Sequence, residues 1–508
     1  MKKTSIVSRI TILFVVFIAT FTLAAQETSV ENAYNYKLDN GLELFVMENH
    51  TVPLTYIEIA VRAGGIGQDV ENAGLFHLYE HMMFKGNSQY PTAAAFQKGL
   101  KSLGVSGWNG STSSECVHYF FKIPSDLTEK GLEFWSSAIR NPLLDSKELE
   151  NEKKVVISEI SGGYGDPGTI LGNAIAKLLF PKFPWRLDPA GPVKNVENAT
   201  VKQLREIQQK YYVPNNAALF VGGDVNHEEV YKMVKKIYGD WPKANDPWTK
   251  DREYQSETPF KQTKYMVMPY SKLSSDLGEV LVLYRGPDTV TDIESTYAAD
   301  ILGNISANPN GIVKQSIINN SELGVPSPDY VSSINFYTQR ESGQISFNAI
   351  LTSPEQSLAE RALYLEQTFQ GIVKQIANNP NYFKSEEYKI VKQQLKDSDV
   401  YARETSSGFL SGLRASWISA SGDYYFNYND KMNNVTAEDV ASYAKKYLED
   451  KPALVVVLVN PDIYEVQKES FKEAGFTTIT QENAYWWKDS MYVKKVGINY
   501  SEQGANDD

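Results

Sequence analysis

The sequence predicts an α+β protein of two homologous domains, each a largely antiparallel sheet packed with helices. Its 508 residues are 42% hydrophobic and 22% charged, which is typical of a globular chain of two or three domains. The segment NATVKQLREIQQKYYVPNNAALFVGGDV begins at Asn198, and NVTAEDVASYAKKYLEDKPALVVVLVNPD begins at Asn434, 236 positions later (434 − 198). A repeat of this length indicates a duplicated domain. Strand-like runs such as LELFVMEN and LTYIEIAVRAG alternate with helical segments, which predicts the mixed architecture.

The first 25 residues have the layout of a secretory signal peptide. Three basic residues precede an apolar run from Ile10 to Phe21, and small residues follow at Ala24 and Ala25. The run is shorter than the roughly 20 residues that a membrane-spanning helix needs. We therefore expect cleavage near Ala25, a periplasmic or secreted mature protein, and no stable membrane insertion after cleavage. An uncleaved anchor is the alternative.

Charge and cysteine content restrict the partners and the means of stabilisation. The formal net charge is −12 and the pI about 5.2, which disfavours binding to nucleic acid and to anionic membranes. Cys116 is the only cysteine, so the chain has no intrachain disulfide despite its expected export. We interpret Cys116 as a small buried side chain on a strand.

The repeated unit defines the expected domain boundaries. Each copy reads as a helix, a proline-marked turn and an apolar strand, and Thr200 and Thr436 are the expected helix N-caps. These features divide the chain into a signal peptide (1–25), an N-terminal domain (31–242), a polar linker (243–263), a homologous C-terminal domain (264–480) and a tail that we expect to be frayed (481–508).

The stretch GLFHLYEHMMFKG contains two of the five histidines of the chain. We expect a helix capped by Asn72 and ended by Gly86, on which His77 and His81 lie one turn apart with Glu80 on the same face. Two imidazoles and a carboxylate at this spacing form the inverted zinc-binding motif. The alternative is an ordinary, partly buried helix, because a zinc site needs a third protein ligand.

A second helix offers that third ligand. In LDSKELENEKKVVISEISGG, Asp145 and Glu148 form the expected capping box and Gly162 the expected stop. Glu152 and Glu159 are seven residues apart, so they share one face of this helix. The alternative is a solvated surface, which is the usual place of a glutamate-rich helix.

The combined pattern resembles the pitrilysin/insulinase family of zinc metallopeptidases. That family has His-x-x-Glu-His and then two glutamates seven apart; here Glu159 lies 78 positions after His81 (159 − 81). The resemblance covers nearly the whole mature chain and is strongest in the first domain. It implies that His77, His81 and Glu159 bind Zn²⁺, that Glu80 is the catalytic base, and that Glu152 is a supporting carboxylate of the catalytic site.

The segment GVSGWNGSTSSECVHYFFKIP resembles the family pattern Asn-Ala-x-Thr-x-x-Asp. The resemblance implies an edge strand that pairs with the substrate backbone, so Asn109, Gly110, Ser111 and Thr112 are candidate substrate-binding residues. Gly110 and Glu115 depart from the family residues. The alternative for Asn109 is an ordinary turn asparagine.

A further departure concerns the second domain. Active single-chain relatives carry there an arginine and a tyrosine, seven apart, that reach the substrate. This chain has no arginine between Arg285 and Arg340, and Tyr330 lacks the partner spacing. The resemblance also implies that this chain is one half of a metallopeptidase clamshell. We therefore expect a homologous companion subunit in a heterodimer, or a homodimer.

The expected function is that of an exported zinc endopeptidase that hydrolyses peptide bonds in unfolded or short peptides. Within this class, the chain could be a catalytic subunit that is inactive until its companion contributes the arginine and tyrosine. The alternatives are a non-catalytic peptide-binding or assembly subunit of the same fold, and a zinc hydrolase that acts on other substrates.

Overall fold

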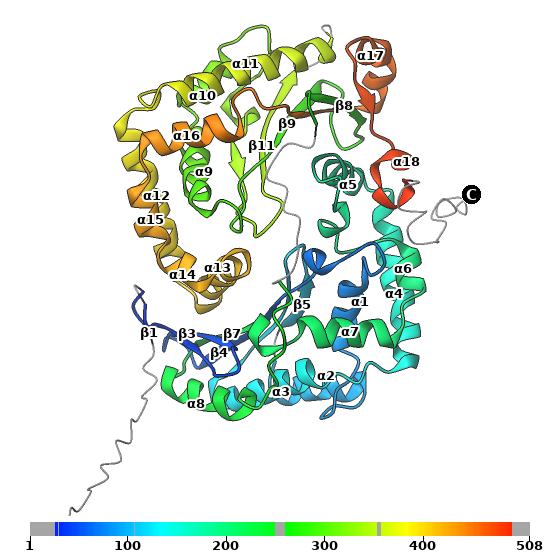
Figure 1. Ribbon diagram of the computed structural model, residues 1–508, viewed down its shortest axis with the longest axis vertical. Helices are drawn as coiled ribbons and strands as arrows, with labels where there is room; N and C mark the ends of the chain where they lie inside the picture. The colour runs from blue at the N-terminus through cyan, green and yellow to red at the C-terminus, as the bar shows by residue number, and fades with distance from the viewer. Residues whose placement is uncertain (1–25, 29, 106, 249–259, 353–356, 490–508) are drawn as a thin grey trace, which may run out of the picture.

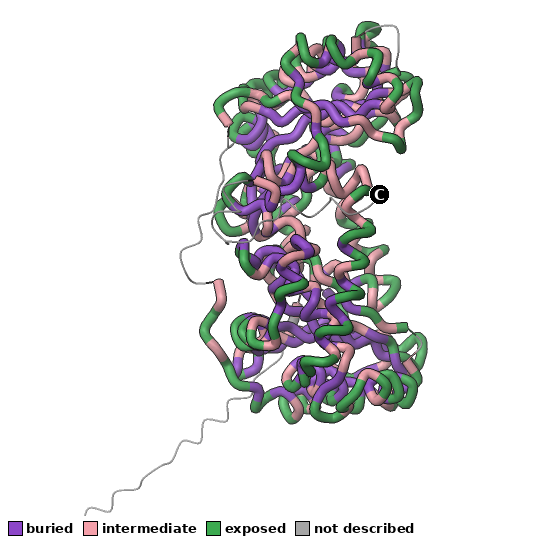
Figure 2. Tube along the Cα trace, turned by 90° about the vertical axis from the view of Figure 1, so that its right-hand side faces the viewer, coloured by how far each residue is buried: buried purple, intermediate pink, exposed green. Residues whose placement is uncertain are grey.

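The protein consists of two domains, each built on one β-sheet, which lie one above the other in Figure 1. Each domain has its own core of buried residues (Figure 2). The two-domain α+β architecture is therefore confirmed. The computed structural model describes residues 26–28, 30–105, 107–248, 260–352 and 357–489. The predicted signal peptide lies outside the described residues, as do residues 249–259 of the predicted linker.

The N-terminal domain contains a seven-stranded sheet in the order β1-β2-β3-β7-β4-β6-β5. Neighbouring strands are antiparallel except for β3 and β7, which run parallel. The strands are β1 (Gln26–Glu27), β2 (Ala33–Lys37), β3 (Glu43–Glu48), β4 (Leu54–Arg62), β5 (Trp108–Thr112), β6 (Cys116–Pro124) and β7 (Ala217–Gly223).

The C-terminal domain contains a six-stranded sheet in the order β10-β11-β9-β12-β8-β13. Here β8 runs parallel to both of its neighbours, and the other pairs are antiparallel. The strands are β8 (Lys264–Pro269), β9 (Leu277–Arg285), β10 (Asn335–Phe336), β11 (Gln344–Thr352), β12 (Leu454–Val459) and β13 (Thr477–Thr478).

Helices cover the outer face of each sheet (Figure 1). The helices of the N-terminal domain are α1 (Leu75–Met83), α2 (Ala93–Ser102), α3 (Thr128–Arg140), α4 (Ser146–Tyr164), α5 (Pro167–Leu179), α6 (Val193–Glu197), α7 (Val201–Tyr211) and α8 (His227–Tyr238). The later ones are α9 (Ile293–Ser306), α10 (Ile312–Ile318), α11 (Leu358–Asn378), α12 (Ser385–Ala402), α13 (Ser406–Ser419), α14 (Gly422–Phe426), α15 (Tyr428–Asn434), α16 (Ala437–Tyr447), α17 (Pro461–Glu473) and α18 (Gln481–Ala484). Short 3₁₀ helices are η1 (Gly65–Gly67), η2 (Ser125–Leu127), η3 (Pro184–Arg186), η4 (Pro214–Asn216), η5 (Pro328–Tyr330) and η6 (Trp486–Lys488).

The duplicated unit occupies the same place in both sheets. Thr200 caps α7 and Thr436 caps α16, each in a capping box, so both expected N-caps are confirmed. The strand that follows each helix is inserted into the middle of its sheet: β7 between β3 and β4, and β12 between β8 and β9. Both inserted strands are buried along their whole length, which explains their continuous apolar sequence.

Each domain covers the inner face of the other domain's sheet with a helix. From the C-terminal domain, α13 places Leu410 and Trp417 against Phe220 of the N-terminal sheet. From the N-terminal domain, α5 and the residue that ends it, Leu179, join Leu458 in the apolar cluster on the second sheet. In Figure 1 both helices lie between the two sheets. This exchange makes the two domains one packed unit.

The start of the predicted tail is packed, so the expected fraying is wrong for residues 481–489. Tyr485, Trp486 and Trp487 are each 1% exposed and belong to the apolar cluster that contains α5. Lys177 of α5 also pairs with Asp489 at 2.6 Å. Three adjacent aromatic side chains provide enough apolar area to fix this segment despite its polar neighbours.

Candidate metal centre

Helix α1 carries both histidines of the sequence motif. It begins after Gly74, whose φ of 91° is unfavourable for any other residue. The expected cap at Asn72 is wrong, because the Asn72 side chain accepts a hydrogen bond from the backbone N–H of Asp69 before the helix begins. The helix ends at Met83 and does not reach Gly86. The buried side chains of α1 that fix it in the domain core are Leu75, Phe76, Leu78, Tyr79, Met82 and Met83.

Helix α4 supplies the two glutamates. Asp145 caps it by accepting hydrogen bonds from two backbone N–H groups of the first turn. The helix continues past the expected stop at Gly162 and ends at Tyr164. The side chain of Glu152 is 6% exposed and that of Glu159 is 49% exposed. Glu152 is therefore enclosed by protein, whereas Glu159 is accessible to solvent.

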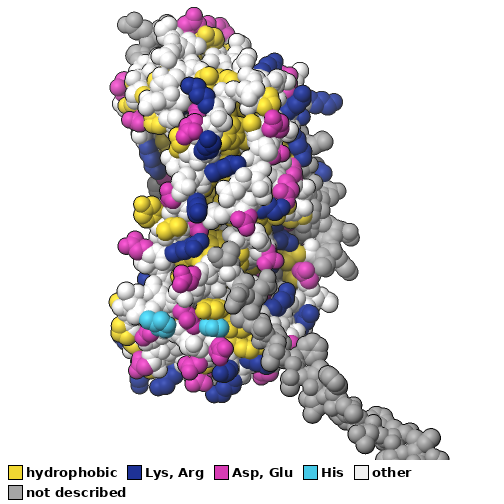
Figure 3. All heavy atoms as spheres, turned by 90° about the vertical axis from the view of Figure 1, so that its left-hand side faces the viewer, with side chains coloured by type: hydrophobic (Ala, Val, Ile, Leu, Met, Phe, Trp, Pro, Cys, Tyr) yellow, Lys and Arg dark blue, Asp and Glu magenta, His cyan; other side chains and the backbone are white. Residues whose placement is uncertain are grey.

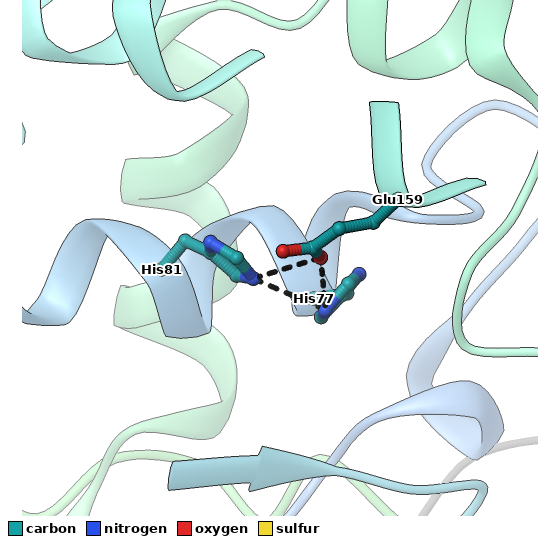
Figure 4. Close-up of side chains that lie close together, drawn as sticks. All are labelled: His77, His81 and Glu159. Atoms are coloured by element: carbon teal, nitrogen blue, oxygen red, sulfur yellow. Dashed lines mark hydrogen bonds and ion pairs between the residues drawn. The ribbon is translucent and has the colours of Figure 1, made fainter. Parts of the chain in front are cut away.

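The structure brings His77, His81 and Glu159 together (Figure 4). The two Nε2 atoms lie 3.2 Å apart, and Glu159 Oε2 lies 3.7 Å from the His77 Nε2 and 3.5 Å from the His81 Nε2. Ligand atoms about 2.0–2.1 Å from a tetrahedral zinc ion are about 3.3 Å from one another. The distances between the three atoms bracket that value, so this donor set fits a zinc ion.

A second carboxylate orients one of the imidazoles. His81 Nδ1–H donates to Glu152 Oε1 at 2.9 Å, and Lys85 Nζ donates to Glu152 Oε2 at 2.6 Å. Because the proton is on Nδ1, the Nε2 lone pair of His81 faces His77 and Glu159. Sequence reasoning missed Lys85. Its position four residues after His81 was the available signal, because the expected helix up to Gly86 would place both residues on one face, although α1 itself ends at Met83.

The protonation states of His77 and Glu152 suit a metal site. Burial, with a smaller contribution from His81, lowers the pKa of His77 to about 4, so this ring is neutral near pH 7. Burial also lowers the pKa of His81, but the Glu152 hydrogen bond and the charge of Glu159 outweigh burial and raise it. Burial raises the pKa of Glu152, but hydrogen bonds from His81 and Lys85 outweigh burial and lower it. Glu152 is therefore a carboxylate near pH 7.

Glu80 is buried beside the strand β5. Thr112 Oγ1 donates to Glu80 Oε2 at 2.6 Å. Burial raises the pKa of Glu80, and the Thr112 hydrogen bond offsets part of this rise. A Cβ atom at Gly110 would lie 3.1 Å from Glu80 Oε1 and 2.8 Å from the ring of Phe84. Gly110, which stands where the family pattern has alanine, therefore leaves space next to the Glu80 carboxylate.

The four candidate substrate-binding residues form most of β5. Asn109 lies in this strand and not in a turn. Asn109 and Ser111 are exposed, Gly110 is buried and Thr112 is half-buried, which is the alternation of a strand with one covered face. Within the described residues β5 pairs only with β6, so it is an edge strand of the sheet. Its unpaired edge offers backbone N–H and C=O groups near Glu80.

The turn after β5 is attached to the C-terminal domain. The buried carboxylate of Glu115 accepts hydrogen bonds from the backbone N–H groups of Arg340 and Glu341, both at 2.9 Å. Glu341 in turn pairs with Arg186 at 2.5 Å. Burial raises the pKa of Glu115 to about 7. Glu115, the second residue that departs from the family pattern, thus forms a contact between the domains.

A second buried group of charges lies where α13 meets the N-terminal sheet. Glu58 Oε1 lies 2.6 Å from both His118 Nδ1 and Arg414 Nε, and the Tyr56 hydroxyl donates to Glu58 Oε2 at 2.7 Å. His118 is therefore a packed residue of β6, as expected. Cys116 is buried on the same strand, also as expected. Sequence reasoning missed Glu58 and Arg414, which lie in different domains and form no local pattern.

Comparison with known proteins identifies the family. The model of "Insulinase (Peptidase family M16)" matches residues 44–165, and that of "Peptidase M16 inactive domain" matches residues 198–395. The first match includes α1, β5 and the whole of α4, and the second begins at the repeated unit. The chain belongs to the insulinase family of peptidases, peptidase family M16.

Several relatives are named proteases. The chain is 23% identical to the mitochondrial-processing peptidase subunit beta of Saccharomyces cerevisiae over 464 residues, which is 86% of this chain and 93% of the relative. It is 28% identical to the zinc protease PqqE of Helicobacter pylori over 204 residues, 40% of this chain and 45% of the relative. This chain is thus a homologue of zinc proteases.

Solved structures share the fold. Pitrilysin aligns with a TM-score of 0.71 and 16% identity, covering 89% of this chain and 49% of pitrilysin. The periplasmic protease PqqL of Escherichia coli aligns with a TM-score of 0.67 and 19% identity, covering 89% of this chain and 51% of PqqL. The chain therefore spans about half the length of these two proteins. None of the helices among the described residues is long and apolar enough to cross a membrane.

Proposed function

We propose that this protein is an exported zinc metalloendopeptidase that hydrolyses peptide bonds in unfolded or short peptides. The observation that carries the proposal is the convergence of two imidazole nitrogens and a carboxylate oxygen within 3.2–3.7 Å, beside a buried glutamate and an edge strand. Several relatives are named zinc proteases, which supports zinc-dependent peptide hydrolysis as the class of reaction. The signal-peptide layout of the first 25 residues supports export.

In this proposal His77, His81 and Glu159 hold the zinc ion. Zinc bound there would supply a Lewis acid for the scissile carbonyl and for the attacking water. Glu80 takes a proton from the attacking water and returns it to the leaving amine. Its burial suits this role, because a raised pKa brings a carboxylate closer to the pH at which it must accept and release a proton.

The proposed substrate site is the unpaired edge of β5. An extended peptide that adds there as a further strand receives backbone hydrogen bonds, which tolerate many side chains. Asn109 and Ser111 are exposed on this strand, whereas Thr112 contacts Glu80. The same edge would not bind a folded substrate, because a folded protein has few free extended segments. This geometry favours peptides over other substrates of zinc hydrolases.

We further propose that a companion completes the active site, either a homologous subunit or a second copy. Pitrilysin and PqqL are about twice as long as the matching part of this chain, and the yeast relative is named a subunit. The sequence between Arg285 and Arg340 contains no arginine that could stabilise charge on the reacting carbonyl. Loss of one such donor typically lowers kcat by about 10²–10³-fold.

One set of variants tests this proposal. The purified chain is expected to contain nearly one zinc ion per chain, measured by elemental analysis, and His81→Ala to lose most of it. Glu80→Gln is expected to keep zinc and to lower peptidase turnover by about 10²–10⁴-fold. Glu71→Gln, an exposed glutamate before α1, is the control and should change neither.

The same assays separate the alternatives. Loss of zinc in Glu80→Gln would show that Glu80 is a ligand and that its assigned role is wrong. Zinc binding without turnover, in the lone chain and in a mixture with its homologous companion, would favour the non-catalytic peptide-binding or assembly subunit. Full turnover by the chain alone, abolished in Glu80→Gln, would show that no companion other than a second copy of this chain is needed.

A further inference from the structure

Helix α4 ends in a turn that its own sequence makes weak. The last turn reads Ser-Gly-Gly-Tyr, with Gly162 and Gly163 directly before Tyr164. Glycine weakens the interior of a helix more than any residue except proline. A Cβ atom at Gly162 would meet no other atom within 4 Å, so no neighbouring group packs against this position. The last turn of α4 therefore needs support from outside the helix.

The zinc ligand proposed on this helix depends on that turn. Glu159 precedes Tyr164 by five residues (164 − 159), and the α-helical pattern pairs its carbonyl with the N–H of Gly163. Its side chain is 49% exposed. Within the described part of the chain, its carboxylate lies beside the two imidazoles and pairs with no Lys or Arg. The position of Glu159 is therefore set mainly by the backbone of α4.

Residues near the C-terminus support the end of α4. In the C-terminal segment (residues 481–489), Gln481 Nε2 donates to the Tyr164 carbonyl at 3.1 Å, and the Tyr485 hydroxyl donates to the same carbonyl at 2.9 Å. The last carbonyls of a helix have no partner within the helix, so this carbonyl would otherwise lack a donor. The Tyr164 ring packs 5.4 Å from that of Tyr485 and 5.8 Å from that of Trp487. In Figure 1, α18 at the start of this segment lies above α4 and contacts α5.

A second contact at the same corner is weaker. Asp166, two residues after Tyr164, pairs with Lys272 of the C-terminal domain at 2.5 Å, but the two side chains are 38% and 55% exposed. An ion pair this exposed contributes little to stability. Tyr485 and Trp487, in contrast, are each 1% exposed and bury their whole rings. The C-terminal segment is therefore the main support of the helix end.

The two domains are also joined on the opposite side of the molecule. There α13 packs against the N-terminal sheet (Figure 1). The view from that side shows hydrophobic side chains at mid-height, between surfaces that carry charges of both signs (Figure 3). Loss of the two hydrogen bonds at Tyr164 should therefore loosen the end of α4 and leave the domains together.

We propose that the C-terminal segment is a positioning element of the zinc site. It holds the last turn of α4 and thereby keeps the Glu159 carboxylate 3.5–3.7 Å from the two imidazole nitrogens. This inference rests on the proposed function in taking Glu159 as a zinc ligand. It assigns a role in zinc binding to Gln481 and Tyr485, although Gln481 lies 317 positions after the helix end that it supports. A chain whose C-terminal segment is displaced would bind zinc less tightly.

Zinc affinity of the full chain tests the proposal. The double variant Gln481→Ala, Tyr485→Phe removes both donors and keeps the aromatic ring. Its dissociation constant for zinc, measured by competition with a chromogenic chelator, is expected to rise about 10-fold, because two hydrogen bonds are lost. Tyr447→Phe is the matched control: it removes a hydroxyl that donates to Asp292 at 2.6 Å, away from α4, and should leave zinc affinity unchanged.

A compensating substitution separates this role from a general loss of stability. Gly162→Ala strengthens the last turn of α4, because alanine is the best helix former and its Cβ atom has space. Added to the double variant, it is expected to return the zinc dissociation constant toward the wild-type value. Gly371→Ala makes the same change at an exposed position of α11, also with space for the Cβ atom, and should not restore zinc affinity.

Hydrogen exchange of the zinc-free protein gives a readout that does not depend on zinc. The amides of residues 161–164 are expected to exchange about 10-fold faster in the double variant than in the wild type. Unchanged zinc affinity in the double variant would overturn the proposal, as would equal restoration by Gly162→Ala and Gly371→Ala. A wild-type chain that binds no zinc would instead contradict the proposed function, and faster exchange in the double variant would still show that the segment supports α4.

Discussion

Replacing Glu152 by glutamine is expected to weaken zinc binding although no ligand is removed. The carboxylate lies 2.9 Å from His81 Nδ1 and 2.6 Å from Lys85 Nζ, and its side chain is 6% exposed. Glutamine keeps the shape but loses the charge, and only one of its two terminal atoms accepts hydrogen bonds. Loss of such a partner typically weakens metal affinity about 10–100-fold. That range corresponds to about 1.4–2.7 kcal/mol of binding free energy.

The measurement is zinc affinity, by competition with a chromogenic chelator near neutral pH. The matched control is Glu150→Gln, which removes the same charge from the same helix. Glu150 is 66% exposed in its side chain and pairs with Lys153, so its loss should leave zinc affinity unchanged. If Glu152→Gln binds zinc as tightly as Glu150→Gln, the role of Glu152 in orienting His81 is wrong.

Two further predictions concern residues near β5. Thr112→Val removes the donor to buried Glu80 and should lower kcat/KM about 10-fold with zinc retained, whereas Thr51→Val, the same substitution at an exposed turn before β4, should not; equal activity of the two variants would refute this. Burial raises the pKa of Glu115 to about 7 in the folded chain, above the 4.5 of an unperturbed glutamate. The folded chain therefore binds more protons than the unfolded chain, and its stability falls as the pH rises through the window between these two values. Urea unfolding at the two ends of the window should show the wild type losing up to about 3 kcal/mol relative to Glu115→Gln, and a constant difference would contradict the assignment.

The zinc motif and the repeated unit could be predicted because their signals are local. The spacing of His77 and His81 places both rings on one helical face, whichever residue begins the helix. The helix begins after Gly74 and not after the expected cap, Asn72, but this difference leaves the expected relative positions of the two histidines unchanged. The caps at Thr200 and Thr436 are equally local, since a threonine before a helix satisfies backbone N–H groups within one turn.

The residues that sequence reasoning missed depend on contacts between distant segments. Glu58 and Arg414 come from different domains, and only the folded structure shows that their opposite charges form an ion pair. The packing of Trp486 and Trp487 depends on α5, which lies some three hundred residues earlier in the chain. Periodicity and composition describe one segment at a time, so they do not report whether a buried charge or an aromatic run has found its partner.

The contacts between the domains also explain why the domain with the proposed zinc site is joined to a second domain that contributes none of the proposed ligands. The edge strand β5 ends in a turn whose Glu115 is held by two backbone N–H groups of the C-terminal domain. Helix α13 of that domain covers the inner face of the same sheet. An isolated N-terminal domain would expose this apolar face and leave Glu115 without its two donors. The C-terminal domain therefore contributes to the position of the proposed substrate strand even though the proposed zinc ligands all lie in the other domain.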